Sequence, residues 1–111
     1  MHIAVHVQTK ESKFDLIVVS GHADHEDGKD FDENYYQLVC AEVSAVSVGI
    51  LNSIDIQCPD SCDLIKEDGF VSIRVKKSSE KLETILKTFV IQLDTIEVIN
   101  KKYLEIKKVE V

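Results

Sequence analysis

Two residues of this sequence have the chemistry of a cysteine-based catalytic pair. Cys40 falls in the first turn of an apolar helix predicted over residues 38–54, and His22 follows Gly21, where a predicted strand ends. A thiol near a helix N-terminus ionises more readily, because the exposed N–H groups and the helix dipole stabilise the thiolate. An imidazole beside it acts as base for the thiol and later as acid for a leaving amine. The N–H groups just after Cys40 also offer hydrogen bonds to an oxyanion.

The spacing of His22 and Cys40 alone does not exclude that both residues are purely structural. A cysteine in an apolar helix is commonly a small hydrophobic side chain, and a histidine and a cysteine at this separation occur often by chance. In the predicted helix Cys40, Ser44 and Ser47 recur at i, i+4 and i+7, so small residues form a stripe along one side. Bulkier Val and Ile residues flank that stripe.

A second set of residues suggests a metal. Cys58 and Cys62 form a C-x₃-C pair, and His2 and His6 share one face of a predicted strand. Four such ligands match a zinc site in number and type. No second knuckle accompanies the pair, so we interpret both thiols as packing residues and expect no metal and no cofactor. The spacing also differs from the C-x-x-C of redox proteins.

Residues 22–37 show no periodicity and carry six acids against one lysine. Irregular stretches of this length are uncommon in small domains and tend to be functional. We expect residues 23–37 to be the least ordered segment, and His25 within it to be solvated. The pair Tyr35-Tyr36 has two open interpretations, a hydrophobic lid over a substrate or an attachment point for the loop.

The elements that must position these residues follow from periodicity and turn signals. A small α+β domain is predicted in the order ββαββαβ, with two helices on one face of a mainly antiparallel sheet. Asp68-Gly69 marks a tight hairpin, Cys58-Pro59 ends the first helix, and Ser78 and Ser79 offer caps to the second. The predicted strands cover 2–8, 14–20, 62–66, 70–76 and 103–111, and the second helix runs to Asn100.

Length, composition and net charge limit the classes of function that this chain could have. The chain has 111 residues, 44% of them hydrophobic and 30% charged, which fits one domain over residues 1–111. No apolar run predicts a membrane span and no N-terminal pattern predicts a signal peptide, so we expect a cytoplasmic protein with free thiols. The net charge of −7 argues against nucleic acid and favours a basic protein partner.

The helix predicted over 38–54 carries Glu42 as its one charged residue. A helix that is apolar all round packs on more than one side. A chain this short has limited means to cover it, so we expect a symmetric homodimer.

The residues around the pair carry a family resemblance. Ser20-Gly21-His22-Ala23, followed by Val39-Cys40-Ala41-Glu42-Val43-Ser44-Ala45, resembles the ribosomal-processing cysteine protease family, Prp. The resemblance implies a homodimeric cysteine endopeptidase. It implies removal of the N-terminal extension of large-subunit ribosomal protein number twenty-seven, with cleavage after aromatic residues. It places Cys40 as nucleophile and His22 as base.

The chain departs from the family pattern at several positions. The segment 31–36 resembles an insertion, and Gln37 stands where many members have an Asp. Asp30, in Gly28-Lys29-Asp30, resembles that acid displaced, so Asp30 and Gln37 are both candidates to orient the histidine. Glu42 replaces a small residue, and a carboxylate so near Cys40 opposes thiolate formation. The resemblance further suggests substrate-binding roles for Gly21, Ala23, Tyr35, Tyr36 and Ser44.

Two functions of different class follow. One is the cysteine endopeptidase, and the other is a non-enzymatic homodimeric assembly or binding module of the same fold. The intact pair of His22 and Cys40 favours the endopeptidase.

Overall fold

The computed structural model describes residues 2–23 and 31–111 and confirms the predicted ββαββαβ order. Its elements, in chain order, are β1 (His2–Lys10), β2 (Lys13–Ala23), α1 (Glu33–Gln57), β3 (Cys62–Glu67), β4 (Phe70–Val75), α2 (Glu80–Ile99) and β5 (Leu104–Glu110). The strands form one sheet in the order β3-β4-β2-β1-β5. The β1–β5 pair is parallel and the other pairs are antiparallel, so the sheet is mainly antiparallel as predicted.

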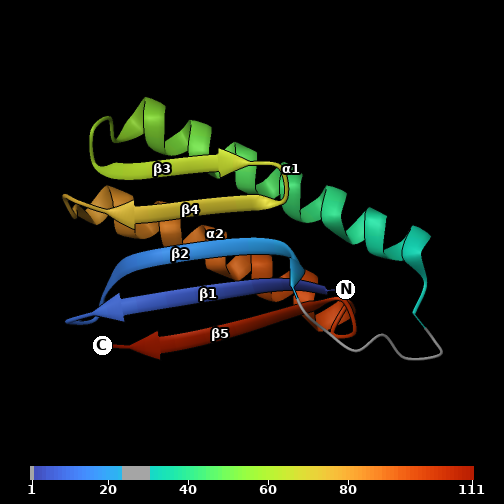
Figure 1. The fold of residues 1–111 in the computed structure, drawn as a ribbon. Helices are drawn as coiled ribbons and strands as arrows, with labels where there is room; N and C mark the ends of the chain where they lie inside the picture. Colours follow the sequence, from blue (N-terminus) through green and yellow to red (C-terminus); the bar gives the residue numbers. More distant parts are fainter. Residues whose placement is uncertain (1, 24–30) are drawn as a thin grey trace.

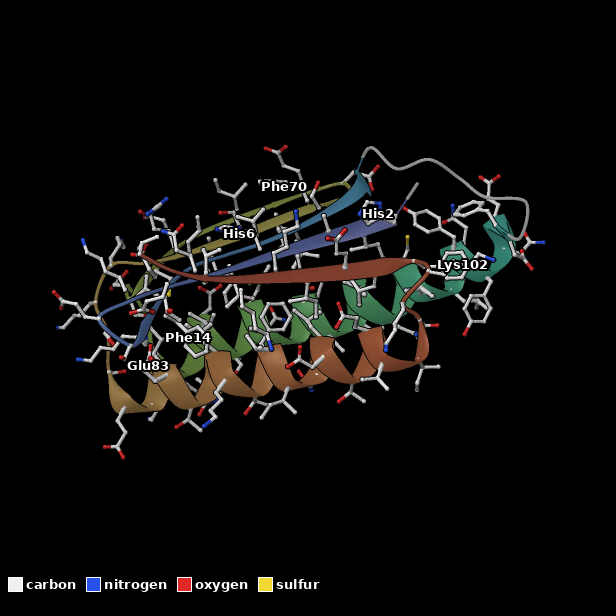
Figure 2. All side chains as sticks on the ribbon, turned by 90° about the horizontal axis from the view of Figure 1, so that it is seen from below. His2, His6, Phe14, Phe70, Glu83 and Lys102 are labelled. Atoms are coloured by element: carbon white, nitrogen blue, oxygen red, sulfur yellow. The ribbon has the colours of Figure 1, made fainter. Side chains whose placement is uncertain are left out.

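Both helices cover the same face of this sheet, as predicted, and pack side by side beneath it (Figure 1 and Figure 2). The apolar stripe of α2 is buried against the strands, with Leu82, Leu86, Phe89 and Leu93 fully inaccessible. Alternate residues of each central strand point into this core, among them Val5, Ile17, Val19 and Ile73. His6 and Phe70 lie on the opposite face (Figure 2).

The first helix starts earlier than the sequence predicted, at Glu33 instead of Leu38. Asp32 is its N-cap, and the side chain accepts hydrogen bonds from the backbone N–H groups of Asn34 (2.9 Å) and Tyr35 (3.2 Å). A cap of this kind satisfies donors that the first helical turn leaves open. The prediction that residues 33–37 are irregular is therefore wrong, while 24–30 lie outside the described residues.

An aromatic cluster explains why the helix can begin among so many acids. Phe31, Tyr35, Tyr36 and Tyr103 pack ring against ring, with centroids 5.2–6.4 Å apart. Tyr36 is completely buried, and the Tyr35 hydroxyl donates a 2.7 Å hydrogen bond to Asn100, the C-cap of α2. Tyr35 therefore attaches the start of α1 to the C-cap of α2, and Tyr36 packs on Tyr103 just before β5. Both act as attachment points, and their role in substrate binding stays a prediction.

The second strand also extends further than predicted. It continues through Gly21 to Ala23, and the Gly21 N–H donates a 2.8 Å hydrogen bond to the carbonyl of Gly69. Gly69 has φ of 70°, which suits glycine in the predicted Asp68-Gly69 turn. The prediction of a strand end at Gly21 is wrong because this contact gives the strand a further partner.

One helix, α1, is long and apolar enough by length and composition to cross a membrane. Its inner side packs on the sheet instead, through buried residues that include Val39, Val43, Ile50 and Ile54. Leu38 and Ile56 remain 62% and 79% exposed. One chain thus covers one side of α1, and the predicted burial on further sides is not met within it.

Replacing the cap tests how much the start of α1 depends on Asp32. We expect Asp32→Ala to lower the free energy of unfolding by about 1 kcal/mol, since two N–H groups lose their acceptor. Urea unfolding followed by circular dichroism measures the change. Glu42→Ala removes the same charge from an exposed position inside the helix and should stay within about 0.5 kcal/mol of the parent. Equal effects of the two substitutions would contradict the capping role.

Candidate active site

A partly enclosed cleft of about 340 Å³ lies between α1 and the turn that joins β3 to β4. Its lining combines apolar side chains with polar and charged ones, the charged residues coming from the β3–β4 hairpin. The lining residues include Gln37, Cys40, Val43, Ser44 and Ser47 from α1, with Gly21, Gly69, Phe70 and Val71 from the strands and turn. The hydrogen bond from Gly21 to Gly69 joins the end of β2 to this turn and so closes one side of the cleft.

Cys40 is half-buried and lines this cleft. It lies about two turns inside α1 and not in the first turn, because the helix begins at Glu33. The N–H groups that follow Cys40 bond to carbonyls of the preceding turn. The predicted stabilisation of the thiolate by a helix terminus, and the predicted oxyanion contact from those N–H groups, are therefore both wrong. Any activation of this thiol has to come from a neighbouring side chain.

The backbone of His22 lies beside the cleft, because its neighbour Gly21 forms part of the lining. The β1–β2 register passes from the pair His2 and Ala23 to the pair Ala4 and Ser20, a β-bulge or irregularity. Two residues of β2, Gly21 and His22, thus stand opposite Ile3 alone. Bulges commonly occur beside active sites, where they redirect a side chain.

The other residues predicted for the site fall into three groups. Gln37 and Ser44 are exposed and line the cleft, as does Gly21. Tyr35 and Tyr36 belong to the aromatic cluster at the start of α1. The side chains of His22 and Ala23, and all of Asp30, lie outside the described residues. Glu42, which the sequence placed close to the thiol, is solvent-exposed and outside the lining of the cleft.

The residues considered for zinc are spread over the sheet. Cys58 caps the end of α1 and Cys62 begins β3, where it pairs with Val75, whereas His2 pairs with Ala23 at the opposite end of the sheet. Within 2–23 and 31–111, no three His, Cys, Asp or Glu side chains gather as a metal would require. Burial raises the pKa of the Cys62 thiol, against a smaller lowering effect of the hydrogen bond with Ser61.

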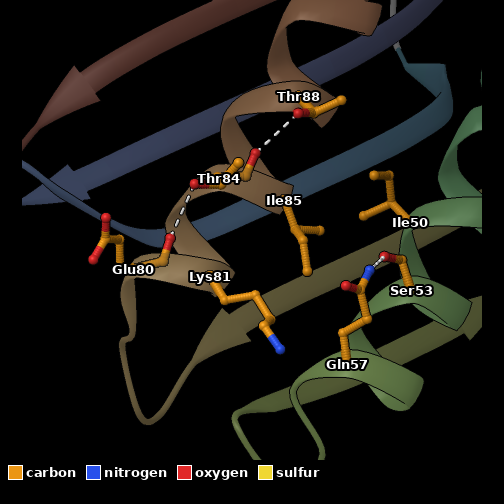
Figure 3. A pocket seen from close by; sticks show the side chains of 8 residues that line it. All are labelled: Ile50, Ser53, Gln57, Glu80, Lys81, Thr84, Ile85 and Thr88. Atoms are coloured by element: carbon orange, nitrogen blue, oxygen red, sulfur yellow. Dashed lines mark hydrogen bonds between the residues drawn. The ribbon is translucent and has the colours of Figure 1, made fainter.

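A second, more open groove runs between the two helices (Figure 3). Its hydroxyls are bonded within their own helices: Thr84 donates to the Glu80 carbonyl at 3.1 Å and Thr88 to the Thr84 carbonyl at 2.9 Å. The Gln57 amide likewise donates to Ser53 at 2.7 Å. The hydroxyls and the amide of this groove are therefore already bonded, and no cysteine or histidine among the described residues lines it, so the cleft at Cys40 is the better candidate.

Sequence reasoning missed one wall of the cleft. The lining residues that come from the β3–β4 hairpin are Lys66, Glu67, Asp68, Gly69, Phe70 and Val71. The hairpin itself was predicted from Asp68-Gly69. Its place beside α1 depends on the sheet order, which places β4 next to β2.

Comparison with known proteins places the chain in a family. Residues 2–105 match the family model of cysteine protease Prp. The ribosomal processing cysteine protease Prp of Staphylococcus aureus is 33% identical over 90 residues, which cover 78% of this chain and 79% of the relative. The same values hold for the protein from a second strain of that species.

Solved structures agree with this match. The S. aureus protease Prp in complex with a substrate peptide superimposes with a TM-score of 0.79 at 25% identity, covering 96% of this chain and 99% of the other. Its complex with a covalently linked product peptide gives a TM-score of 0.77 at 28% identity over the same shares. A Streptococcus mutans protein, SMU.848, shares the fold with a TM-score of 0.76 at 18% identity, covering 99% of this chain and 96% of that one. The fold, the cleft at Cys40 and the family match lead to one conclusion: this chain belongs to the Prp family of cysteine proteases.

Proposed function

We propose that this chain is a cytoplasmic cysteine endopeptidase that removes the N-terminal extension of large-subunit ribosomal protein number twenty-seven before ribosome assembly. In this proposal Cys40 is the nucleophile and His22 the general base. The observation that carries the proposal is the cleft itself, since it is lined by the Cys40 thiol and by the residue next to His22. The related S. aureus protease is described with a substrate peptide and with a covalently linked product peptide, which a thiol nucleophile explains.

The proposed reaction has two stages. His22 takes the Cys40 proton, and the thiolate sulfur forms a bond to the scissile carbonyl carbon. When the tetrahedral intermediate collapses, the C–N bond breaks and the imidazolium gives its proton to the leaving amine. A water molecule, deprotonated by His22, then attacks the thioester and releases the acid product with the thiol restored.

Charge along the cleft supports a basic substrate. Glu67, at the end of β3, and Asp68, in the turn that follows, line the cleft with Lys66 beside them. The first sixty residues carry 11 acids against 3 lysines. Acidic groups around a cleft speed the encounter with a basic segment and favour it over an acidic one. The apolar walls formed by Val43, Val71 and others suit the aromatic residues that the family resemblance implies before the bond.

The proposed catalytic pair is tested by substitution. With a peptide that spans the ribosomal protein's N-terminal extension, we expect Cys40→Ser to abolish cleavage, because one histidine activates a hydroxyl poorly. His22→Ala should lower turnover by about 100-fold or more. Cleavage is read by mass spectrometry, and circular dichroism checks that each variant is folded. Cys58→Ser and Cys62→Ser should be nearly neutral, and an active Cys40→Ser enzyme would reject the assignment.

Alkylation rates separate the endopeptidase from the non-enzymatic module. We expect iodoacetamide to label Cys40 fastest near neutral pH, since it lines an open cleft beside the proposed base, and to label buried Cys58 slowest. Because burial raises the pKa of Cys62, its thiolate forms at a higher pH than in the unfolded chain, so its labelling should accelerate only in alkaline solution. Mass spectrometry of peptides after partial labelling gives all three rates. Equal, slow labelling of the three thiols would favour the non-enzymatic module.

We also propose that the protein acts as a homodimer through the outer side of α1. Leu38 and Ile56 are exposed there, and so are Ala41, Ala45 and Gly49, which follow one another at helical spacing. Small residues along a helix let a second backbone approach closely, and the two-fold arrangement would pair this side with its own copy. Ala41 also lines the cleft, so the proposed interface borders the site.

A charge at Ala45, the middle one of the three exposed small residues on α1, should separate the proposed dimer. We expect the parent protein to sediment as a dimer at micromolar concentration and Ala45→Glu to sediment as a monomer, because the partner would have to bury an unpaired carboxylate. Analytical ultracentrifugation measures both. Thr95→Glu, at an exposed position of α2, is the matched control and should remain dimeric. A monomeric parent protein would contradict the proposal.

A further inference from the structure

One buried polar side chain in the cleft takes no part in the proposed reaction. Ser47 is 1% exposed and lines the same cleft as Cys40. Within residues 2–23 and 31–111, its hydroxyl has no hydrogen-bond partner. A buried hydroxyl without a partner is costly, and most such groups in native proteins are satisfied. A hydroxyl of this kind that lines a cleft is available to a polar group that enters the cleft.

Other helical hydroxyls in this protein show that the lack of a partner is specific. Thr84, Thr88 and Thr95 of α2 each donate to the carbonyl four residues earlier, at 3.1, 2.9 and 2.8 Å. This back-bonding is the usual way in which a helix satisfies a hydroxyl. Ser47 does not make that bond, although it too lies inside a helix. Ser44, one turn earlier, is exposed and therefore accessible to water.

The position of Ser47 relative to the thiol limits which part of a substrate reaches it. Cys40 and Ser47 are at i and i+7 and line one cleft, so they share a side of α1 and lie about 10 Å apart along its axis. A reacting carbonyl lies about 3 Å from its nucleophile. A long substrate side chain that points along the helix from this carbonyl covers the rest of the distance. Val19, Val43 and Val71 line the apolar cleft that such a side chain would enter.

We propose that Ser47 is a specificity-determining residue. It hydrogen-bonds the polar end of a substrate side chain whose apolar body fills the cleft. The side chains that fit are long and end in a phenol or an amide, as in tyrosine and glutamine. This inference rests on the proposed peptidase function, because it takes the occupant of the cleft to be a peptide.

Matched peptides test the proposal without turnover. In the Cys40→Ser background, fluorescence anisotropy measures the Kd of labelled peptides that carry Tyr or Phe, and Gln or Met, at each of three positions before the bond. At one position we expect the polar side chain to bind about tenfold more tightly than its apolar counterpart. Adding Ser47→Ala should remove or reverse that preference, since the polar end would then be buried without a partner.

Stability gives a second measurement that separates a ligand-binding hydroxyl from a structural one. Ser47→Ala should raise the Tm of the peptide-free protein by about 2–5 °C, because it removes an unsatisfied buried group. Ser53→Ala changes the same residue type on the same helix, where the hydroxyl accepts a bond from Gln57. It controls for helix propensity and should leave the peptide preference intact.

The outcomes of these experiments distinguish failure of the Ser47 proposal from failure of the peptidase proposal. A lower Tm for Ser47→Ala, or equal binding of polar and apolar peptides at every position, would overturn the role of Ser47 while peptide binding itself stands. If no peptide binds to the Cys40→Ser protein and none is cleaved by the parent protein, the proposed peptidase function fails, and this inference fails with it.

Discussion

The packing of Tyr103 against the start of α1 is the contact on which the site depends. Its ring meets Phe31, Tyr35 and Tyr36, and its hydroxyl accepts a 3.1 Å hydrogen bond from the Asp32 N–H. Tyr103 directly precedes β5, so the start of the helix is attached to the sheet that it covers. A helix is rigid over two turns. This contact therefore also fixes the position of Cys40 along the helix axis and the direction in which Cys40 faces the strands.

The opposite wall of the cleft depends on a backbone contact. The N–H of Gly21 bonds the carbonyl of Gly69, where the β3–β4 turn reaches the end of β2. Tyr36 belongs to the same junction, since its hydroxyl lies 3.8 Å from the position that a Cβ on Gly21 would occupy. The cleft is thus bounded by three segments far apart in sequence, which meet through one buried ring and one hydrogen bond.

The sequence allowed most of the fold to be predicted, because its signals were local. Alternation in β1, the Asp68-Gly69 turn and the stripe of α2 all lie within short windows, and each element appears where its pattern indicated. The start of α1 escaped prediction because its one fully buried residue, Tyr36, stands among exposed polar residues and gives no helical period. Its burial depends on Tyr103, far away in the chain.

For the candidate site too, residue types could be predicted from the sequence and long-range contacts could not. Cys40 was identified by residue type and family resemblance, but the reason given for its reactivity depended on a helix boundary that a distant aromatic contact determines. The hydroxyl of Ser47 was visible as one member of a small-residue stripe, whereas its lack of a partner appears only in three dimensions. The β3–β4 wall could not be assigned to the site without the strand order.

The parallel pairing of β1 with β5 has a consequence for how the chain folds. Ile3 pairs with Leu104 and Thr9 with Glu110, so these contacts close a loop that contains nearly the whole chain. Loops of this size are slow to close because their entropy must be lost before the contacts form. Since Tyr103 adjoins β5, the residue that positions the start of α1 comes from the far end of this loop. On a translating ribosome, the nascent chain would lack a finished cleft until residues 103–110 had left the exit tunnel.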